Sequence, residues 1–230
     1  MIFTDKLVHG RLIKRYKRFL ADIELDNGEI ITAHCTNSGS MKSCLENNAE
    51  VYVSPANDSK RKTKFTWEMI KINGNWVGIH TGNPNKIAFE LIKKGEIDKL
   101  KGYTEVRREV KFQDSRFDIM ARNESQTCFV EVKNVTFKEG NYALFPDAVT
   151  IRGKKHLETL MQVKQQGMRA VMLYVIQRTD VSVFAPAKDI DPDYSVTLKK
   201  AYGKGVEIIP VQTKVTPQNI ELYQELPFEL

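Results

Sequence analysis

The 230-residue sequence contains only three cysteines, Cys35, Cys44 and Cys128, and none of them forms a CxxC pair. No histidines stand beside them at zinc-ligand spacing, so we expect no zinc site, and the odd count fits reduced thiols. The sequence also lacks an apolar stretch long enough to span a bilayer, and its first residues lack the apolar core of a signal peptide. These absences predict a cytoplasmic protein without a membrane partner.

The composition is that of a folded, basic protein. Hydrophobic residues make up 41% and charged residues 28% of the chain, whose length suffices for one large domain or two smaller ones. The formal net charge of +6 makes an acidic partner reasonable, with nucleic acid first among the candidates. Charge alone does not identify that partner, because many basic proteins bind no nucleic acid.

The first eighty residues predict a small all-β unit. Alternating apolar and polar residues surround Asn27-Gly28, and Asn73-Gly74 is a second tight-turn dipeptide. Further strands are predicted in AEVYVSP and TKFTWEMIKI. Several short strands with regular turns favour a small barrel or sandwich, and a five-stranded OB-like barrel fits the length of residues 1–82.

The remainder, residues 83–230, predicts an α/β domain, so that the whole chain is α+β. Helices are expected at about 83–95, 152–166 and 194–202, and strands near 104–112, 116–121 and 127–135. The later segments MRAVMLYVIQ, VSVFAP and VEIIPVQ also read as strands, the first of them buried on both faces. A strand, a helix and a buried strand in succession predict a βαβ crossover within a mixed sheet.

Charged residues stand on two neighbouring predicted strands where a plain sheet would carry neutral ones. Glu131 and Lys133 share one face of their strand, because side chains alternate, and Asp118 lies on the preceding strand between Phe117 and Ile119, both expected to point to the core. A hairpin would bring Asp118 and Glu131 together, and two close carboxylates repel unless a cation intervenes. Mg²⁺ (or Mn²⁺) suits such a pair, and Lys133 could orient a water or stabilise a phosphate. The other interpretation is a solvated strand face with a cross-strand ion pair.

The spacing of these three residues, Asp-x(12)-Glu-x-Lys, resembles the core of PD-(D/E)XK nucleases. The chain as a whole resembles the sugar fermentation stimulation protein A (SfsA) family, in the stretches RFLADIEL, TAHCTNSGSM, GYTEVRREV, SRFDIMA, FVEVKNVT, ALFPDAVTIRGKKHL, QRTDVSVFAPA and IDPDY. This resemblance implies an N-terminal OB-fold-like domain, a PD-(D/E)XK nuclease-like domain, DNA binding and a proposed role in regulating maltose utilisation. It puts Asp118, Glu131 and Lys133 at the three motif positions, with Phe117 where such nucleases usually have proline.

Nucleases of this kind often take a further acidic ligand from the helix before the first strand. We therefore predict Glu90 as a third metal ligand beside Asp118 and Glu131. The alternative for Glu90 is a surface ion pair with Lys94 or Lys86. Other candidates for the third carboxylate are Glu105, Glu109 and Asp147.

Basic residues predicted to contact DNA gather in three places. Two clusters lie beside aromatic residues in the first domain, and the third opens the second predicted helix: Arg11, Lys14, Arg15, Lys17 and Arg18; Lys60, Arg61 and Lys62; Arg152, Lys155 and His156. Cations at a helix N-terminus make sense where a phosphate docks, and the loop Thr36–Met41 could add backbone N–H contacts. The other interpretation is solvated surfaces, with Phe19, Phe65 and Trp67 in the core and His156 partly buried.

Two functions follow from these residues and from the resemblance. One is a Mg²⁺-dependent nuclease acting through Asp118, Glu131 and Lys133, with Glu90 as a further ligand. The other is a non-catalytic, largely non-specific DNA-binding regulator that keeps a nuclease-like fold. DNA is the partner in both, and a homodimer is compatible with either. A weaker third hypothesis is that the barrel binds an oligosaccharide.

Overall fold

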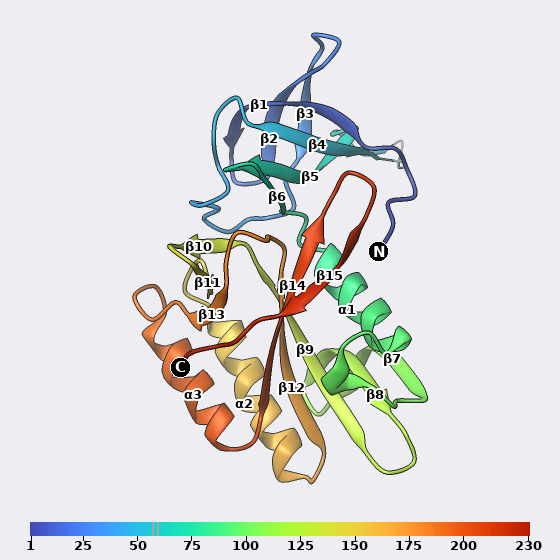
Figure 1. Ribbon diagram of the computed structural model, residues 1–230, viewed down its shortest axis with the longest axis vertical. Coiled ribbons are helices and arrows are strands. Elements are labelled where there is room, and N and C mark those ends of the chain that lie inside the picture. Colours follow the sequence, from blue (N-terminus) through green and yellow to red (C-terminus); the bar gives the residue numbers. More distant parts are fainter. Residues whose placement is uncertain (57, 59) are drawn as a thin grey trace.

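The computed structural model describes residues 1–56, 58 and 60–230 and shows two parts stacked along the long axis (Figure 1). The first part contains β1 (Val8–Tyr16), β2 (Leu20–Leu25), β3 (Ile30–His34), β4 (Glu50–Pro55), β5 (Phe65–Ile72) and β6 (Asn75–Gly78). The second contains three α-helices, α1 (Asn83–Lys94), α2 (Ile151–Gln165) and α3 (Pro192–Gly203), and the 3₁₀ turn η1 (Asp98–Leu100). Its strands are β7 (Glu105–Phe112), β8 (Ser115–Arg122), β9 (Thr127–Val135), β10 (Phe137–Glu139), β11 (Tyr142–Phe145), β12 (Arg169–Ile176), β13 (Val183–Pro186), β14 (Glu207–Val215) and β15 (Ile220–Glu225).

The first part is the predicted barrel. Its strands follow the order β3-β2-β1-β4-β5-β6, and a parallel pairing of β3 with β5 closes the first five strands on themselves. The turn glycines Gly28 and Gly74 have φ of 83° and 77°, which is why glycine follows asparagine in both turns. Trp67 is fully buried, as expected, whereas Phe19 at the β1–β2 turn is 48% exposed and does not belong to the core.

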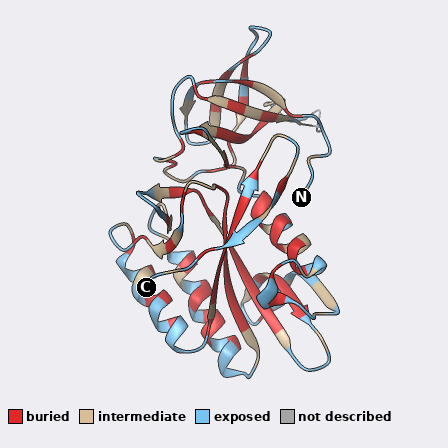
Figure 2. Cartoon of the chain, viewed as in Figure 1, coloured by how far each residue is buried: buried red, intermediate tan, exposed pale blue. Residues whose placement is uncertain are grey.

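The second part is an α/β domain around a mixed six-stranded sheet of order β15-β14-β12-β9-β8-β7. Strands β9, β12 and β14 run parallel, and the outer strands are antiparallel to their neighbours. Helix α1 packs on one face and α2 and α3 on the other, so β12 is buried along nearly its whole length (Figure 2). No helix among the described residues is long and apolar enough to cross a membrane.

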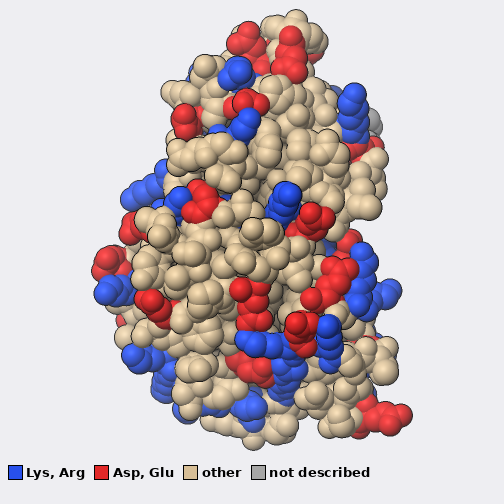
Figure 3. Space-filling model, in the orientation of Figure 1, with Lys and Arg blue, Asp and Glu red and all other residues tan. Residues whose placement is uncertain are grey.

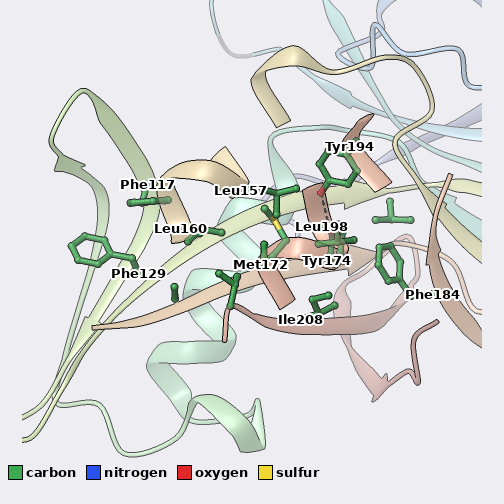
Figure 4. Packing of buried hydrophobic residues seen from close by; sticks show 14 of the residues in the cluster. Phe117, Phe129, Leu157, Leu160, Met172, Tyr174, Phe184, Tyr194, Leu198 and Ile208 are labelled. Atoms are coloured by element: carbon green, nitrogen blue, oxygen red, sulfur yellow. Dashed lines mark hydrogen bonds between the residues drawn. The ribbon is translucent and has the colours of Figure 1, made fainter. Parts of the chain in front are cut away.

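The core on the α2 and α3 side of this sheet is rich in aromatic rings (Figure 4). The hydroxyls of Tyr174 on β12 and Tyr194 on α3 lie 2.6 Å apart, so each buried hydroxyl has a partner. Phe117 and Phe129, on neighbouring strands, pack with their ring centroids 5.4 Å apart. Leu157, Leu160 and Val163 of α2 belong to the same core, which packs α2 and the polar residues it carries against the sheet.

The alternation of side chains along β8 is broken at Asp118, contrary to the prediction that Phe117 and Ile119 face one core. Phe117 packs on the α2 side, and Ile119 packs on the α1 side. Glu109, which faces this point from β7, has a φ of 55°, and β8 pairs with β9 only from Ile119 onward. Asp118 therefore lies where β8 bends and separates from β9.

The two parts are joined by a buried polar junction. Arg178 is 1% exposed, and its guanidinium donates to Asp180 at 2.7 and 2.9 Å, to the carbonyl of Thr136 at 2.7 Å and to Ser43 Oγ of the first part at 3.2 Å. Burial alone would raise the pKa of Asp180, but hydrogen bonds from Arg178 and Lys138 outweigh it and lower that pKa to about 2. The junction therefore holds the loop after β3 against the end of β9.

Candidate active site

Glu131 and Lys133 lie on β9 and point to the same side of the sheet, as alternation predicts. The ammonium of Lys133 donates to Glu131 Oε1 at 2.7 Å, and their side chains are only 13% and 3% exposed. A buried ion pair of this kind is costly to form and even costlier to break, because the remaining charge would have no partner. Glu131 and Lys133 therefore form a buried ion pair, and the alternative interpretation of a solvated strand face does not apply to them.

Asp118 joins this pair from the neighbouring strand. Its Oδ2 accepts a hydrogen bond from the backbone N–H of Val132 at 2.8 Å, and its Oδ1 accepts one from Asn85 Nδ2 at 2.7 Å. Burial and then the negative charge of Glu131 raise the pKa of Asp118 above its ordinary value. The negative charges of Asp118 and Glu131 thus repel each other.

The two oxygens of the Glu131 carboxylate have different surroundings. Oε1 meets both Lys133 and Nδ1 of His156, whereas Oε2 is buried and has no hydrogen-bond partner in the described part of the chain. Burial works to raise the pKa of Glu131, but the hydrogen bond from His156 and the charge of Lys133 outweigh it, so the pKa lies below its ordinary value. Glu131 is therefore an ionised carboxylate with one oxygen left for a further ligand.

His156 is a partner of Glu131 and not the exposed phosphate contact that the sequence predicted. Its ring is 8% exposed, and Nε of Arg152 lies 3.3 Å from its Nε2. A guanidinium can only donate, so Nε2 accepts from Arg152, and Nδ1 faces both Glu131 Oε1 and, at 3.1 Å, the ammonium of Lys133. Arg152 and His156, at i and i+4 of α2, thus orient the carboxylate.

A polar cavity of about 570 Å³ opens onto this group, and we call it the Asp118 cavity. It is lined by Asn85, Glu109, Asp114, Ser115, Arg116, Asp118, Arg152, Lys155 and His156. Three of these residues are cations, of which Arg116 is paired with Glu109 at 2.9 Å. The Glu131 carboxylate lies behind the lining residue His156. A phosphate entering the cavity would meet Arg152 and Lys155 on the way to Asp118.

The donor set fits a hard divalent cation. Two carboxylates repel each other, one of their oxygens is buried without a partner, and a lysine stands beside them. Across the described residues no three His, Cys, Asp or Glu side chains gather closely enough to hold a metal by themselves. Mg²⁺ matches this sparse set, because it binds through one or two carboxylates and keeps several waters.

The structure does not bring Glu90 to the site. Its Oε2 lies 3.3 Å from the N-terminal ammonium of Met1, so neither the predicted metal ligation nor the alternative pair with a lysine describes it. Of the other candidate carboxylates, Glu109 lines the Asp118 cavity, whereas Glu105 pairs with Arg107. The prediction of Glu90 as a metal ligand is wrong. Glu90 lies on another side of α1 from Asn85, and Asn85 is the residue of this helix that contacts Asp118.

Asp147 lies against the barrel and away from Asp118. Its Oδ2 lies 3.4 Å from the backbone nitrogen of Met41 and 3.5 Å from Ser40 Oγ, both in the Thr36–Met41 loop of the barrel. Asp147 thus connects the segment before α2 to the barrel. It is not a ligand beside Asp118.

The basic residues predicted to contact DNA differ in exposure, and contacts to the chain itself do not separate them: the exposed Arg11 donates to Asn48 O at 3.1 Å and Arg152 donates to His156 at 3.3 Å. Some guanidinium groups bind the chain itself: Arg15 donates to the carbonyls of Asn37 at 2.8 Å and Gly39 at 3.0 Å, and Arg61 donates to Thr66 Oγ1 at 3.1 Å. The exposed ones are Arg11, Lys14, Lys17, Arg18, Lys60 and Lys62 on the barrel and Arg152 and Lys155 on α2. On the face shown in Figure 3, lysines and arginines are interspersed with acids, so that face alone does not indicate a DNA surface.

Asn85 is the site residue that the sequence reasoning missed. It lies in the first turn of α1, and its amide holds Asp118 Oδ1. The segment Gly82-Asn83-Pro84-Asn85 reads as an ordinary helix start, and no local pattern distinguishes Asn85 from Asn83, which instead donates to Glu68 at 3.0 Å. Only the docking of α1 on the sheet reveals its role.

Two family models match this chain. One, described as the SfsA N-terminal OB domain, matches residues 13–79, and the other, described as the sugar fermentation stimulation protein RE domain, matches residues 82–219. The sugar fermentation stimulation protein homolog of Geotalea uraniireducens is 50% identical over 221 residues, 96% of each chain. That of Geobacter sulfurreducens is 47% identical over 228 residues, 99% of this chain and 98% of the relative. A structure described as Pyrococcus furiosus SfsA in complex with Ca²⁺ is 27% identical, with a TM-score of 0.89 over 100% of this chain and 98% of that one.

Proposed function

The chain belongs to the sugar fermentation stimulation protein (SfsA) family, and we propose that it is a Mg²⁺-dependent nuclease that hydrolyses DNA phosphodiester bonds. One observation carries the proposal: Asp118 and Glu131 repel each other beside Lys133, and Glu131 Oε2 is buried without a partner. The order α1-β7-β8-β9-α2-β12, with these residues on β8 and β9, is the arrangement that the PD-(D/E)XK resemblance implies. Such an arrangement brings a metal, a water and a phosphate together.

Asp118 and Glu131 Oε2 would hold the metal. Bound Mg²⁺ (or Mn²⁺) would supply a Lewis acid for the phosphate and lower the pKa of a coordinated water. The related protein from Pyrococcus furiosus is described in complex with Ca²⁺, another hard cation that takes oxygen ligands, and this supports a metal role for the family.

The remaining residues of the site have roles that follow from their positions. Lys133, held on Glu131 Oε1, can stabilise the charge that develops on the phosphate or orient the attacking water. Lys155 and Arg152 stand at the cavity lining and can position the scissile phosphate. His156 and Asn85 touch the two carboxylates and act as positioning residues.

A cleavage assay on linear, nicked, flapped and single-stranded DNA with Mg²⁺ or Mn²⁺ tests this function. We expect Lys133→Ala to lower the cleavage rate by about 10²–10³-fold, because it removes charge stabilisation from the transition state. The matched control is Lys199→Ala, an exposed lysine on α3, which should cut at the wild-type rate. The proposal fails if no substrate is cut, or if the two variants cut equally well.

A second candidate function is non-catalytic DNA binding by a regulatory factor. The exposed Lys17, Arg18 and Phe19 at one turn of the barrel favour it, because cations beside an exposed ring can bind phosphates and stack on bases. This function predicts salt-sensitive DNA binding that survives loss of Glu131 and shows no metal-dependent turnover. A role of such binding in sugar metabolism stays a prediction of the family resemblance.

A further inference from the structure

A second cavity lies beside the Asp118 cavity, and we call it the junction cavity. It has a volume of about 410 Å³ and lies between the barrel loop Thr36–Gly39 and the segment Phe145–Thr150 of the second part. The two cavities are neighbours along the chain, because Thr150 lines one of them and Arg152 lines the other. We therefore infer that a chain-like ligand in the Asp118 cavity reaches the junction cavity along the segment Thr150–Arg152.

The two cavities differ in charge. The Asp118 cavity is lined by three cations and three acids, whereas no lysine or arginine of the described chain lines the junction cavity. The junction cavity is instead lined by the apolar residues Phe137 and Leu144, by Asn37 and Asn134 and by Asp147. The groups of the junction cavity suit a flat, uncharged ligand with hydrogen-bonding edges. The cations of the Asp118 cavity suit a phosphate.

Two exposed aliphatic residues lie next to these cavities along the chain: Val149 lines the junction cavity, and Ile151 immediately precedes Arg152 of the Asp118 cavity. Val149 is 72% exposed and Ile151 is 84% exposed, which is unusual for such residues in a well-ordered segment. The backbone that carries them is held firmly, because Thr150 N donates to Asp191 Oδ2 at 2.8 Å and Thr150 Oγ1 caps α2 by accepting from Gly153 N at 3.0 Å. The structure thus keeps two apolar side chains in water beside the candidate active site.

We propose that the junction cavity holds one unpaired base of the DNA strand whose phosphate lies in the Asp118 cavity, and that Val149 and Ile151 separate this base from its neighbours. Apolar side chains that enter a base step unstack it, and an unstacked base needs a polar-edged cavity to receive it. The substrate class is then DNA with an unpaired segment, such as a single strand, a flap or a fork. This inference rests on the proposed function.

The surroundings of Val149 and Ile151 favour DNA over a second protein as their partner. Exposed Arg152 and Lys155 follow them within one turn of α2, so the apolar pair is flanked by positive charge on the side of the Asp118 cavity. A protein interface would place an apolar or acidic surface there, and a second copy of this basic chain would bring more positive charge. A nucleic acid supplies both the phosphates and the apolar base faces.

The test for the base site uses the full chain without divalent metal, so that binding is measured and nothing is cut. An abasic residue is moved along a forked DNA, and we expect one position near the fork to lower the affinity about tenfold, the effect of losing one stacked base. Ala148→Trp, which fills the cavity from an exposed position, should weaken binding similarly and abolish the effect of the abasic residue. If no position is sensitive, or if the abasic effect persists in Ala148→Trp, the base site is wrong.

The test for strand separation compares the double variant Val149→Ser/Ile151→Ser with Val196→Ser, a valine that is 70% exposed on α3. We expect the double variant to lose about tenfold in affinity for forked DNA relative to single-stranded DNA, because only the fork must be opened. Val196→Ser should keep the wild-type ratio. A sedimentation measurement is made in parallel, and a change in oligomeric state with an unchanged ratio would overturn the inference in favour of a protein interface.

The outcomes separate this inference from the proposed function. Binding that shows the abasic effect in a protein that cuts no DNA would sustain the base site and overturn the nuclease. Cutting of intact duplex, fork and single strand at equal rates, unaffected by the variants, would sustain the nuclease and overturn the base site.

Discussion

Nε of Arg152 lies 3.3 Å from Nε2 of His156, and the opposite nitrogen of the same ring contacts the carboxylate of Glu131. An exposed cation at the start of α2 is thereby connected to the buried acid on β9 through a single histidine. A side chain that touches a metal-binding carboxylate without touching the metal fixes the orientation of that carboxylate, and it is often as important as the ligand itself.

Replacement of His156 by alanine should therefore lower the apparent affinity for Mg²⁺ more than the affinity for DNA. We expect His156→Ala to raise the Mg²⁺ concentration for half-maximal cleavage by about 10–100-fold, because Glu131 loses the group that orients it. His156→Gln, which can still donate to the carboxylate, should recover part of the loss. The measurement is cleavage rate against Mg²⁺ concentration.

Lys155 provides the matched control for His156. It precedes His156 on α2 and lines the Asp118 cavity, but it is exposed. Lys155→Ala should lower DNA affinity and leave the Mg²⁺ requirement unchanged, because it removes a phosphate contact only. Equal Mg²⁺ requirements in wild type and His156→Ala would show that His156 does not position Glu131.

The repulsion between Asp118 and Glu131 should make the metal-free protein less stable than a variant that carries only one of these two charges. Asp118→Asn keeps the shape of the side chain and removes one of the two charges, so we expect the free energy of unfolding without metal to rise by about 1 kcal/mol, or about 2–4 °C in Tm. The same variant should lose the increase in Tm that Mg²⁺ gives the wild type. Thermal unfolding with and without Mg²⁺ measures both effects.

Asp114 serves as the comparison for Asp118, because it lines the same cavity but is exposed. Asp114→Asn should change neither the metal-free Tm nor the response to Mg²⁺ by much. A Mg²⁺ response that survives in Asp118→Asn would place the metal elsewhere.

Local patterns were sufficient to predict the barrel, the α/β domain and the pair of carboxylates. The Asn-Gly turns and alternating strands of the first eighty residues are short-range signals, and so is the buried run of β12. Asp118 and Glu131 are separated by a short hairpin, so the pairing of β8 with β9 from Ile119 onward brings them near each other, although the alternation along β8 is broken at Asp118.

The surroundings of the carboxylates could not be predicted, because they depend on how the helices dock. Asn85 and Glu90 are five residues apart on α1, or about 140° around the helix axis, and only docking decides which of them reaches Asp118. The helical period likewise puts Arg152 and His156, at i and i+4, on one stripe of α2. It did not show that this stripe turns toward Glu131.

The junction between the two parts should give the protein an acid-sensitive contribution to stability. The pKa of Asp180 lies near 2 in the folded chain against an ordinary value of 3.8, so the unfolded chain binds more protons between these values and stability rises with pH there. This difference corresponds to about 2 kcal/mol, fully present at neutral pH and lost as the pH falls from about 4 to 2. Asp180→Asn should cost at least that much at pH 7, since Arg178 is left buried without its charged partner.

Urea unfolding from pH 7 down to the acid limit of the native state checks this contribution. The difference between wild type and Asp180→Asn should shrink below about pH 4. Asp193→Asn is the control, because Asp193 is 80% exposed and its pair with Lys154 at 3.2 Å is open to solvent, so little change is expected at any pH. A difference for Asp180→Asn that does not vary with pH would assign the loss to packing and not to charge.

Arg15 and Arg18 lie three residues apart at the β1–β2 turn, yet the structure gives them different tasks. Arg15 donates to three backbone carbonyls of the barrel, those of Arg18, Asn37 and Gly39, whereas Arg18 is exposed beside the exposed ring of Phe19. Arg18→Ala should lower DNA affinity and reduce the slope of log affinity against log salt by about 0.7–0.9, the value for one lost phosphate contact, with Tm unchanged.

Arg15→Ala should show the reverse pattern, because the loop Thr36–Met41 loses the hydrogen bonds that Arg15 donates to two of its carbonyls. We expect a fall in the free energy of unfolding of about 1–3 kcal/mol and an unchanged salt slope. Binding titrations at several salt concentrations, together with thermal unfolding, separate the two cases. If Arg15→Ala reduces the salt slope and Arg18→Ala does not, DNA lies along the loop side of this turn and the exposed tip is not part of the interface.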